Sequence, residues 1–115
     1  MSECIFCRIA AGEIPAKIVS ESDEALAFHD MDPKAPVHVL IVPRKHLPAV
    51  RDAGTSEDRA LLGSLLAFTA RVAGELGLDS SGYRIVTNTG DHGGQSVDHL
   101  HFHLLGGRQM KWPPG

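Results

Sequence analysis

Three histidines, His99, His101 and His103, recur at every second residue near the end of the chain, and an apolar residue follows each of them. Successive side chains of a β-strand point to opposite faces of a sheet, so this period predicts a strand over residues 98–105 with three imidazoles on one face. Imidazole is the commonest metal ligand, and it can act as a nucleophile or as an acid and base near neutral pH. The pattern therefore favours metal binding or histidine catalysis over a merely solvent-facing strand.

A glycine-rich loop, residues 89–96, leads directly into these histidines. Gly93 and Gly94 would let backbone N–H groups approach an anion closely. The side chains of Asn88, Gln95 and Ser96 would add neutral hydrogen-bond donors around that anion. Together with the histidines, the loop predicts a phosphate-binding site.

His101 is the best-placed nucleophile because it has a histidine on each side along the same face. A histidine that attacks phosphorus needs its other ring nitrogen held as a donor, and it needs donors for the charge that gathers on the phosphoryl oxygens. His99 and His103 could orient it or donate protons. No cluster of carboxylates of the kind that holds Mg²⁺ accompanies the loop, which favours covalent catalysis over metal-assisted attack by water.

Cys4 and Cys7 are the only cysteines, spaced as Cys-x-x-Cys. In a reducing compartment this spacing indicates a metal or redox site before a structural disulfide. If residues 37–43 pair antiparallel with residues 98–104, His46 and His99 come close enough to complete a tetrahedral Cys₂His₂ zinc site. The alternative is that both thiols pack as small hydrophobic groups.

The elements that must position these residues form an α+β domain with an antiparallel meander of five strands, one long helix and one short helix. Residues 4–12 are predicted as the short helix, ended by Gly12. Residues 55–76, capped by Thr55, are predicted as the long one. The strands before the histidine strand are predicted at residues 17–22, 24–29, 37–43 and 83–88. His38, on the apolar central strand, is expected to be a buried histidine bonded to a backbone group.

Composition limits the class of protein. A chain of 115 residues with 43% hydrophobic and 22% charged residues suits one globular domain, residues 1–115, ending in a tail over residues 106–115. The net charge is −3, and no basic run is longer than Arg44-Lys45, so we expect no polymeric nucleic acid as a partner. The chain has no apolar run of membrane-spanning length, and the N-terminal Met1-Ser2-Glu3 is acidic. We therefore expect a cytoplasmic protein with no membrane partner.

Residues 99–105, HLHFHLL, resemble the His-φ-His-φ-His-φ-φ signature of the histidine triad (HIT) superfamily, where φ is apolar. Five further segments are similar to the branch of histidine triad nucleotide-binding proteins that act as purine nucleoside phosphoramidases: residues 14–17, 27–30, 88–90, 93–96 and 106–115. The resemblance runs from about residue 4 to residue 115.

The resemblance implies a nucleotide-binding hydrolase in which His101 forms a nucleotidyl-histidine intermediate that water later cleaves. Its substrates would be purine nucleoside phosphoramidates or acyl-adenylates, its products AMP or GMP, and catalysis would need no cofactor. The implied catalytic residues are His99, His101, His103 and Ser96. The implied nucleotide-binding residues are Phe28, His29, Asp30, Met31, Asn88, Gly94, Gln95, Ser96, His101, His103 and Trp112. Asp30 would contact the ribose hydroxyls, although without the family it is most simply a turn former.

The family's proteins are homodimers in which the long helix and a strand of each copy form the dimer contact, so that the two sheets become one continuous sheet. The tail reaches the partner's site. That arrangement would explain Trp112, which could otherwise cap the core of a monomer. Some bacterial members hold a structural zinc, for which Cys4, Cys7, His46 and His99 are the matching residues. Two alternatives remain open: a dinucleoside polyphosphate hydrolase of the same superfamily, and a non-catalytic, nucleotide-responsive protein-interaction module.

Overall fold

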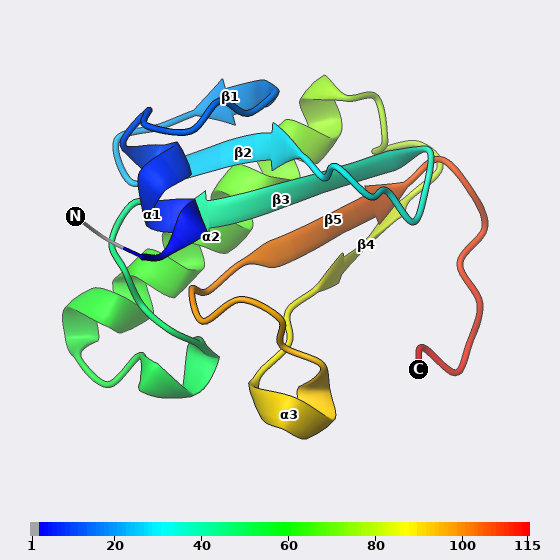
Figure 1. Cartoon of the computed structure of the whole chain (residues 1–115). Coiled ribbons are helices and arrows are strands. Elements are labelled where there is room, and N and C mark those ends of the chain that lie inside the picture. Colours follow the sequence, from blue (N-terminus) through cyan, green and yellow to red (C-terminus); the bar gives the residue numbers. More distant parts are fainter. Residues whose placement is uncertain (1–2) are drawn as a thin grey trace.

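The chain folds around one five-stranded antiparallel sheet, and the computed structural model describes residues 3–115 (Figure 1). Met1 and Ser2, on which the expectation about the N-terminus partly rested, lie outside the described residues. In chain order the elements are α1 (Ile5–Ala10), β1 (Ile18–Glu21), β2 (Ala25–His29), β3 (Val37–Pro43), a 3₁₀ turn η1 (Val50–Asp52), α2 (Ser56–Glu75), β4 (Tyr83–Val86), α3 (Gly90–Gly93) and β5 (Phe102–Gly106). The predicted α+β class is confirmed.

The strand order is β1-β2-β3-β5-β4, and every pair of neighbours is antiparallel. The order differs from a simple meander because β5 lies between β3 and β4. The predicted pairing of β3 with the histidine strand is confirmed, since Leu40 lies opposite His103 and Val39 opposite Leu104. His103 of β5 therefore lies in an interior strand of the sheet.

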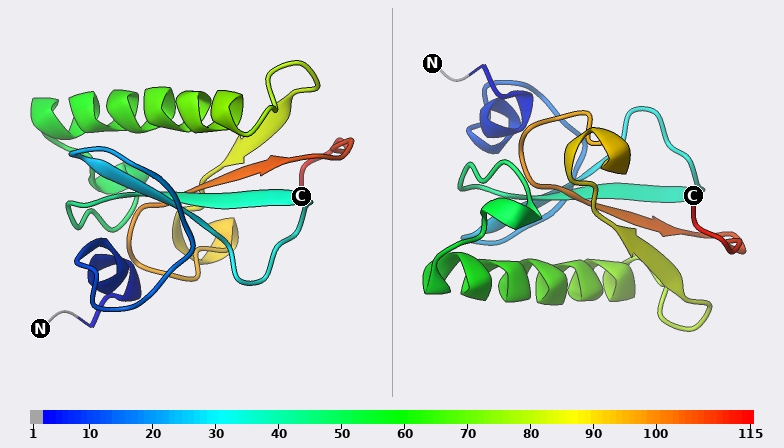
Figure 2. Two further views of the ribbon diagram at one scale, coloured as in Figure 1. Left: turned by 90° about the horizontal axis from the view of Figure 1, so that it is seen from above. Right: turned by 90° about the horizontal axis from the view of Figure 1, so that it is seen from below.

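The two faces of the sheet are covered differently, as Figure 2 shows: α2 lies along one face, while α1 and α3 lie on the other side. Alternate residues of β3 serve the two layers, because strand side chains alternate between faces. Val39 and Ile41 join the core beneath α2, whereas Leu40 and Val42 join a smaller core with Phe6 of α1. The histidine that follows Leu100 must then face α1, since Leu100 belongs to the core beneath α2.

The long helix α2 begins as predicted. The Thr55 hydroxyl accepts a hydrogen bond from the Asp58 N–H at 3.0 Å, which satisfies one of the first backbone donors of the helix. Lys45 pairs with the buried Asp58 carboxylate at 2.6 Å, and this bond lowers the pKa of Asp58. The start of α2 is thereby tied to the segment after β3 that carries His46.

Two predicted elements are wrong in detail. The strand does not span residues 98–105: β5 begins at Phe102, because the backbone before it leaves the ladder and Leu100 N–H donates instead to the Leu47 carbonyl at 2.6 Å. The loop over residues 89–96 contains the short helix α3, which ends at Gly94 with φ of +77°. That left-handed conformation favours glycine.

The tail after β5 runs over the surface. The Arg108 guanidinium donates to the Lys34 carbonyl at 3.0 Å, and that of Arg84 donates to the Lys111 carbonyl at 3.0 Å. Trp112 is 81% exposed, so it does not cap the core of a monomer. Over residues 3–115, none of the helices has the length and apolar character needed to traverse a membrane.

Candidate functional site

His101 and His103 lie side by side on the α1 face of the sheet, with ring centroids 5.1 Å apart. Phe6 of α1 stands edge-on to His101, with its centroid 5.1 Å away, and to His99 at 5.9 Å. The period-two pattern places the imidazoles correctly, although only His103 belongs to a strand. Sequence reasoning did not single out Phe6, because an apolar residue on an amphipathic helix carries no chemical signal.

The ring of His101 is oriented by the backbone. Its Nδ1–H donates to the carbonyl oxygen of His99 at 2.7 Å, within a buried environment. A carbonyl can only accept, so we assign the hydrogen to Nδ1, which leaves the lone pair on Nε2. His101 is 4% exposed. Its backbone carbonyl accepts a hydrogen bond from the Thr87 hydroxyl at 2.9 Å. The arrangement meets the requirement for a histidine nucleophile.

A second set of contacts orients His103. The Lys34 backbone N–H donates to Nδ1 of His38 at 2.9 Å, so the neutral His38 ring carries its hydrogen on Nε2. That Nε2 lies 2.9 Å from Nδ1 of His103 and 3.3 Å from the Asp30 carboxylate. His103 then accepts on Nδ1 and carries its hydrogen on Nε2 as a donor.

The expectation that His38 is buried with a backbone partner is confirmed. Its contact with His103 was missed. The signal is the strand register: Leu40 lies opposite His103, so His38 is the diagonal neighbour on the same face.

Burial keeps the rings of His38 and His103 neutral. Loss of solvation lowers the pKa of His103 from 6.5 to about 4, and the nearby charges of His101 and His38 act in the same direction, against the Asp30 carboxylate. Burial likewise lowers the pKa of His38, opposed by Asp30. Near neutral pH the pair therefore works through fixed hydrogen-bond donors rather than through a positive charge.

The glycine-rich loop holds itself in place through Gln95. Its side-chain amide donates to the carbonyls of Pro48 at 2.7 Å and Val97 at 3.1 Å, and its side-chain oxygen accepts from the Gly90 N–H at 2.9 Å. The Gln95 backbone N–H donates to the Gly90 carbonyl. All three N–H donors of Gln95 are thus engaged within the protein, and the structure gives it a bracing role. Of the other loop residues expected around a phosphate, Gly94 and Ser96 are exposed and Asn88 is half-buried.

The segment expected to hold the nucleoside starts inside the fold and ends in solvent. Phe28 is buried, with its ring centroid 5.8 Å from that of Phe6. His29 is exposed, and Met31 is 100% exposed. Asp30 accepts from the Asp32 N–H at 2.7 Å through one carboxylate oxygen, which is the turn-forming bond. Its other oxygen faces His38.

Cys4, Cys7, His46 and His99 converge on one point, and we call them the thiol–imidazole cluster. Their ligand atoms all lie within 4.8 Å of one another. Nδ1 of His99 is 3.3 Å from Sγ of Cys4, 3.5 Å from Sγ of Cys7 and 3.2 Å from Nδ1 of His46. Nε2–H of His99 donates to the Pro43 carbonyl at 2.9 Å, so Nδ1 carries the lone pair that a metal would need.

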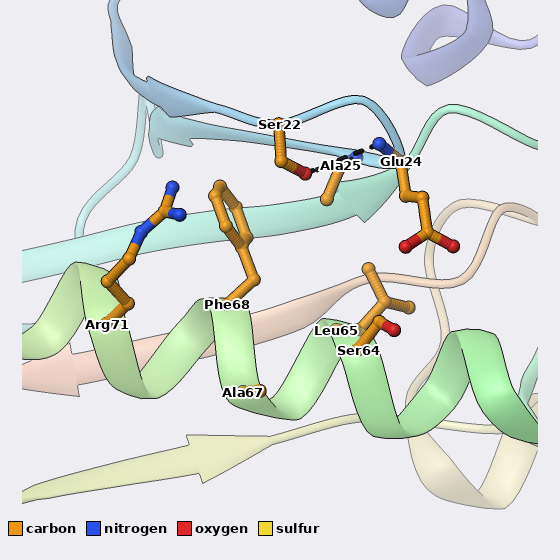
Figure 3. Close-up of a pocket in the computed structure, with 8 residues that line it drawn as sticks. All are labelled: Ser22, Glu24, Ala25, Ser64, Leu65, Ala67, Phe68 and Arg71. Atoms are coloured by element: carbon orange, nitrogen blue, oxygen red, sulfur yellow. Dashed lines mark hydrogen bonds between the residues drawn. The ribbon is translucent and has the colours of Figure 1, made fainter.

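A groove lies elsewhere on the molecule. A groove of about 340 Å³ runs between α2 and the turn joining β1 to β2, on the face away from α1 (Figure 3). The eight residues that line it, all labelled in the figure, include neither a histidine nor a thiol. Glu24 and Arg71 are its charged groups, and Arg71 stacks on Phe68 at 4.9 Å. The candidate chemistry is on the opposite face.

Comparison with known proteins agrees with this geometry. Residues 11–110 match the HIT domain family. An uncharacterized HIT-like protein of Synechocystis is 52% identical over 113 residues, 98% of this chain and 97% of that relative. The crystal structure of a HIT family hydrolase from Legionella pneumophila superposes with a TM-score of 0.94 at 50% identity, covering 98% of this chain and 100% of that one. For a histidine triad nucleotide-binding protein from Candida albicans the TM-score is 0.82 at 32% identity, over 96% and 83% of the two chains. The chain therefore belongs to the HIT family.

Proposed function

We propose that this protein is a purine nucleoside phosphoramidase: a hydrolase that cleaves the P–N bond of a nucleoside phosphoramidate, or the mixed anhydride of an acyl-adenylate. One observation carries the proposal. The bond from His101 Nδ1–H to the His99 carbonyl at 2.7 Å leaves Nε2 of His101 with its lone pair, which is the state a histidine nucleophile requires.

The reaction has two steps. In the first, Nε2 of His101 forms a bond to phosphorus while the bond from phosphorus to the leaving nitrogen breaks, and the leaving amine takes up a proton from solvent. In the second, water attacks the phosphorus of the nucleotidyl-histidine, the bond to Nε2 breaks, and the attacking water returns a proton to solvent. The products are the amine, AMP or GMP, and the unchanged enzyme.

Charge on the phosphoryl oxygens needs fixed donors. Nε2–H of His103 is one, because its other nitrogen accepts from His38 at 2.9 Å. The exposed Ser96 and the backbone of Gly94 at the end of α3 are the others. His99 acts through its backbone carbonyl on His101. In this proposal the nucleoside lies against residues 28–31, with Asp30 toward the ribose.

The relatives support this assignment at a coarser level. The Legionella neighbour is a HIT family hydrolase, and the Candida neighbour is a nucleotide-binding protein by name. Hydrolase chemistry on a nucleotide fits both, together with the nucleophile geometry. The choice of a phosphoramidate over other nucleotides rests on the resemblance of residues 93–96 and 106–115 to that branch.

We assign the thiol–imidazole cluster to a structural zinc. Zn–S bonds of about 2.3 Å and Zn–N bonds of about 2.0–2.1 Å imply tetrahedron edges of about 3.5 Å from sulfur to nitrogen and about 3.3 Å between nitrogens. The observed sulfur-to-nitrogen distances are 3.3, 3.3 and 3.5 Å, and the nitrogens lie 3.2 Å apart. The donor set therefore fits the ion. With four protein ligands the ion would have no position for substrate, so its contribution would be structural.

The proposal includes a homodimer. The strand β4 is at one edge of the sheet, so its outer side is open to pairing with a second copy. Trp112 is 81% exposed on a tail that is bonded to the surface through Lys111. A partner chain that covers this side would bury the indole, as the family resemblance implies.

The test is mass spectrometry of the intact protein during turnover of an adenosine phosphoramidate, quenched without acid because phosphohistidine bonds are acid-labile. We expect an adenylyl adduct on His101 that is absent from His101→Ala, together with loss of AMP release. His92, an exposed histidine of α3, serves as the control: His92→Ala should keep the adduct. Tight AMP binding without adduct or turnover would contradict the proposal and favour a nucleotide-responsive binding protein.

A further inference from the structure

His99 takes part in two groups of contacts, one through its ring and one through its backbone. Its ring nitrogen Nδ1 lies in the thiol–imidazole cluster, 3.3 Å from Cys4 Sγ and 3.5 Å from Cys7 Sγ. Its backbone carbonyl accepts the Nδ1–H of His101 at 2.7 Å. One residue thereby connects a metal-type donor set to the proposed nucleophile, with no intervening side chain.

The segment that carries His99 has few other supports. Its ladder pairing with β3 ends at Phe102, opposite Ile41. Ahead of that point, Nε2–H of His99 donates to the carbonyl of Pro43, the last residue of β3, at 2.9 Å, and Leu100 N–H donates to the Leu47 carbonyl at 2.6 Å. The Thr87 hydroxyl donates to the His101 carbonyl at 2.9 Å. A strand would hold this backbone by regular ladder pairing, whereas here a few isolated hydrogen bonds, some of them made by side chains, hold it.

The helix α1 reaches the nucleophile by a second route. Cys4 caps the helix, with Sγ accepting from the Cys7 N–H at 3.4 Å, and Cys7 lies in its first turn. Between them, Phe6 packs edge-on against the rings of both His99 and His101. The position of α1 therefore affects the same ring whose tautomer the His99 carbonyl selects. The helix has six residues, too few to be stable alone, so its position depends on what anchors it.

We propose that the thiol–imidazole cluster, once it holds its metal, is a positioning device for His101, fixing the His99 carbonyl and Phe6 so that Nε2 faces the phosphorus. Cys4, Cys7 and His46 are then positioning residues for a reaction they do not touch. The expected effect on kcat rests on the proposed function, whereas the expected effect on the position and tautomer of His101 does not.

The experiment compares the zinc-loaded protein, the same protein stripped with a chelator, the stripped protein reloaded with zinc, and Cys7→Ser. Ile5→Ala is the matched control, since Ile5 lies on α1 between the cysteines but is exposed. Cobalt(II) in place of zinc reports tetrahedral thiolate binding by its absorption bands. Nitrogen-15 NMR of the histidine rings reports whether His101 keeps its Nδ1–H, and steady-state kinetics give kcat and KM for an adenosine phosphoramidate.

We expect kcat to fall about 10- to 100-fold in the stripped protein and in Cys7→Ser, the range found when groups that orient a site are removed. KM should change less than about twofold, and the His101 Nδ1–H signal should broaden or be lost. Reloading with zinc should restore both in the wild type but not in Cys7→Ser, and Ile5→Ala should match the wild type.

Three results would overturn the inference: no metal binding by the wild type, or a metal that stabilises the fold while leaving kcat unchanged, or one that leaves the His101 signal unchanged. If neither form hydrolyses the substrate, the proposed function fails. The NMR comparison still decides the positioning role in that case, because a cluster that only anchors α1 would not alter the His101 tautomer.

Discussion

At the level of single residues, backbone groups decide which nitrogen of each histidine ring carries the hydrogen. The His99 carbonyl holds Nδ1–H of His101, and the Pro43 carbonyl holds Nε2–H of His99. The Lys34 N–H does the reverse at His38, by donating to Nδ1. Rigid backbone donors and acceptors therefore assign a different role to each ring, although the rings are chemically identical.

The role of His38 can be tested by substitution. In His38→Phe, Nδ1 of His103 loses the donor 2.9 Å away, so its hydrogen can move from Nε2 to Nδ1 and the phosphoryl oxygens lose a donor. We expect kcat for an adenosine phosphoramidate to fall about 10- to 100-fold, the effect of removing one preorganised donor or its support. His38→Gln, whose amide can still donate, should recover part of the rate. Equal rates for Phe and Gln would contradict this role.

At the level of the elements, the glycine-rich loop depends on one side chain that links three backbone groups. Gln95→Ala would leave the Gly90 N–H and the Pro48 carbonyl without their present partners. We expect a loss of about 1–2 kcal/mol in the free energy of unfolding, from urea titration. We also expect faster hydrogen exchange at the Gly90 amide and a lower kcat/KM.

Gln109→Ala is the control, because Gln109 is exposed in the tail and its side-chain amide donates to the neighbouring Met110 carbonyl. It should leave stability and exchange at Gly90 unchanged. If Gln95→Ala keeps wild-type exchange at Gly90 while AMP affinity falls, Gln95 contacts the phosphate directly and the bracing role is wrong.

How far sequence predicts these elements depends on the range of the interactions that determine them. The capped start of α2 and the apolar strand over residues 37–43 are set by local sequence, and both are confirmed. The start of β5 was misplaced because the contact that ends the ladder, from Leu100 to Leu47, joins residues far apart in sequence. The bond from Gln95 to the Pro48 carbonyl could not be predicted for the same reason, since these two residues lie far apart in sequence.

At the level of the whole molecule, the sheet separates stability from chemistry. One face is closed by α2 over an apolar core, and α1 and α3 lie on the other side (Figure 2). On that side the rings of His99 and His101 pack against Phe6 of α1. On this side, where Phe6 and Phe28 form part of a smaller core, burial lowers the pKa of His38, His99 and His103. The chemistry of the site and the pH dependence of folding are therefore linked through the same rings.

That linkage predicts acid sensitivity. The pKa of His103 is about 4 in the folded protein, against 6.5 without the fold, so below about pH 6.5 the unfolded chain binds a proton that the folded chain does not. Stability is thus fully present above pH 6.5 and is lost as the pH falls toward 4. Allowing for screening of this half-buried ring, we expect the free energy of unfolding to drop by about 1 kcal/mol between pH 7 and pH 5. Urea titrations at several pH values, with a chelator present, give the slope of the free energy of unfolding against pH. This slope should be shallower for His103→Gln than for the wild type, and unchanged for His92→Gln. Identical slopes for the wild type and both variants would contradict the assignment of this pH dependence to His103.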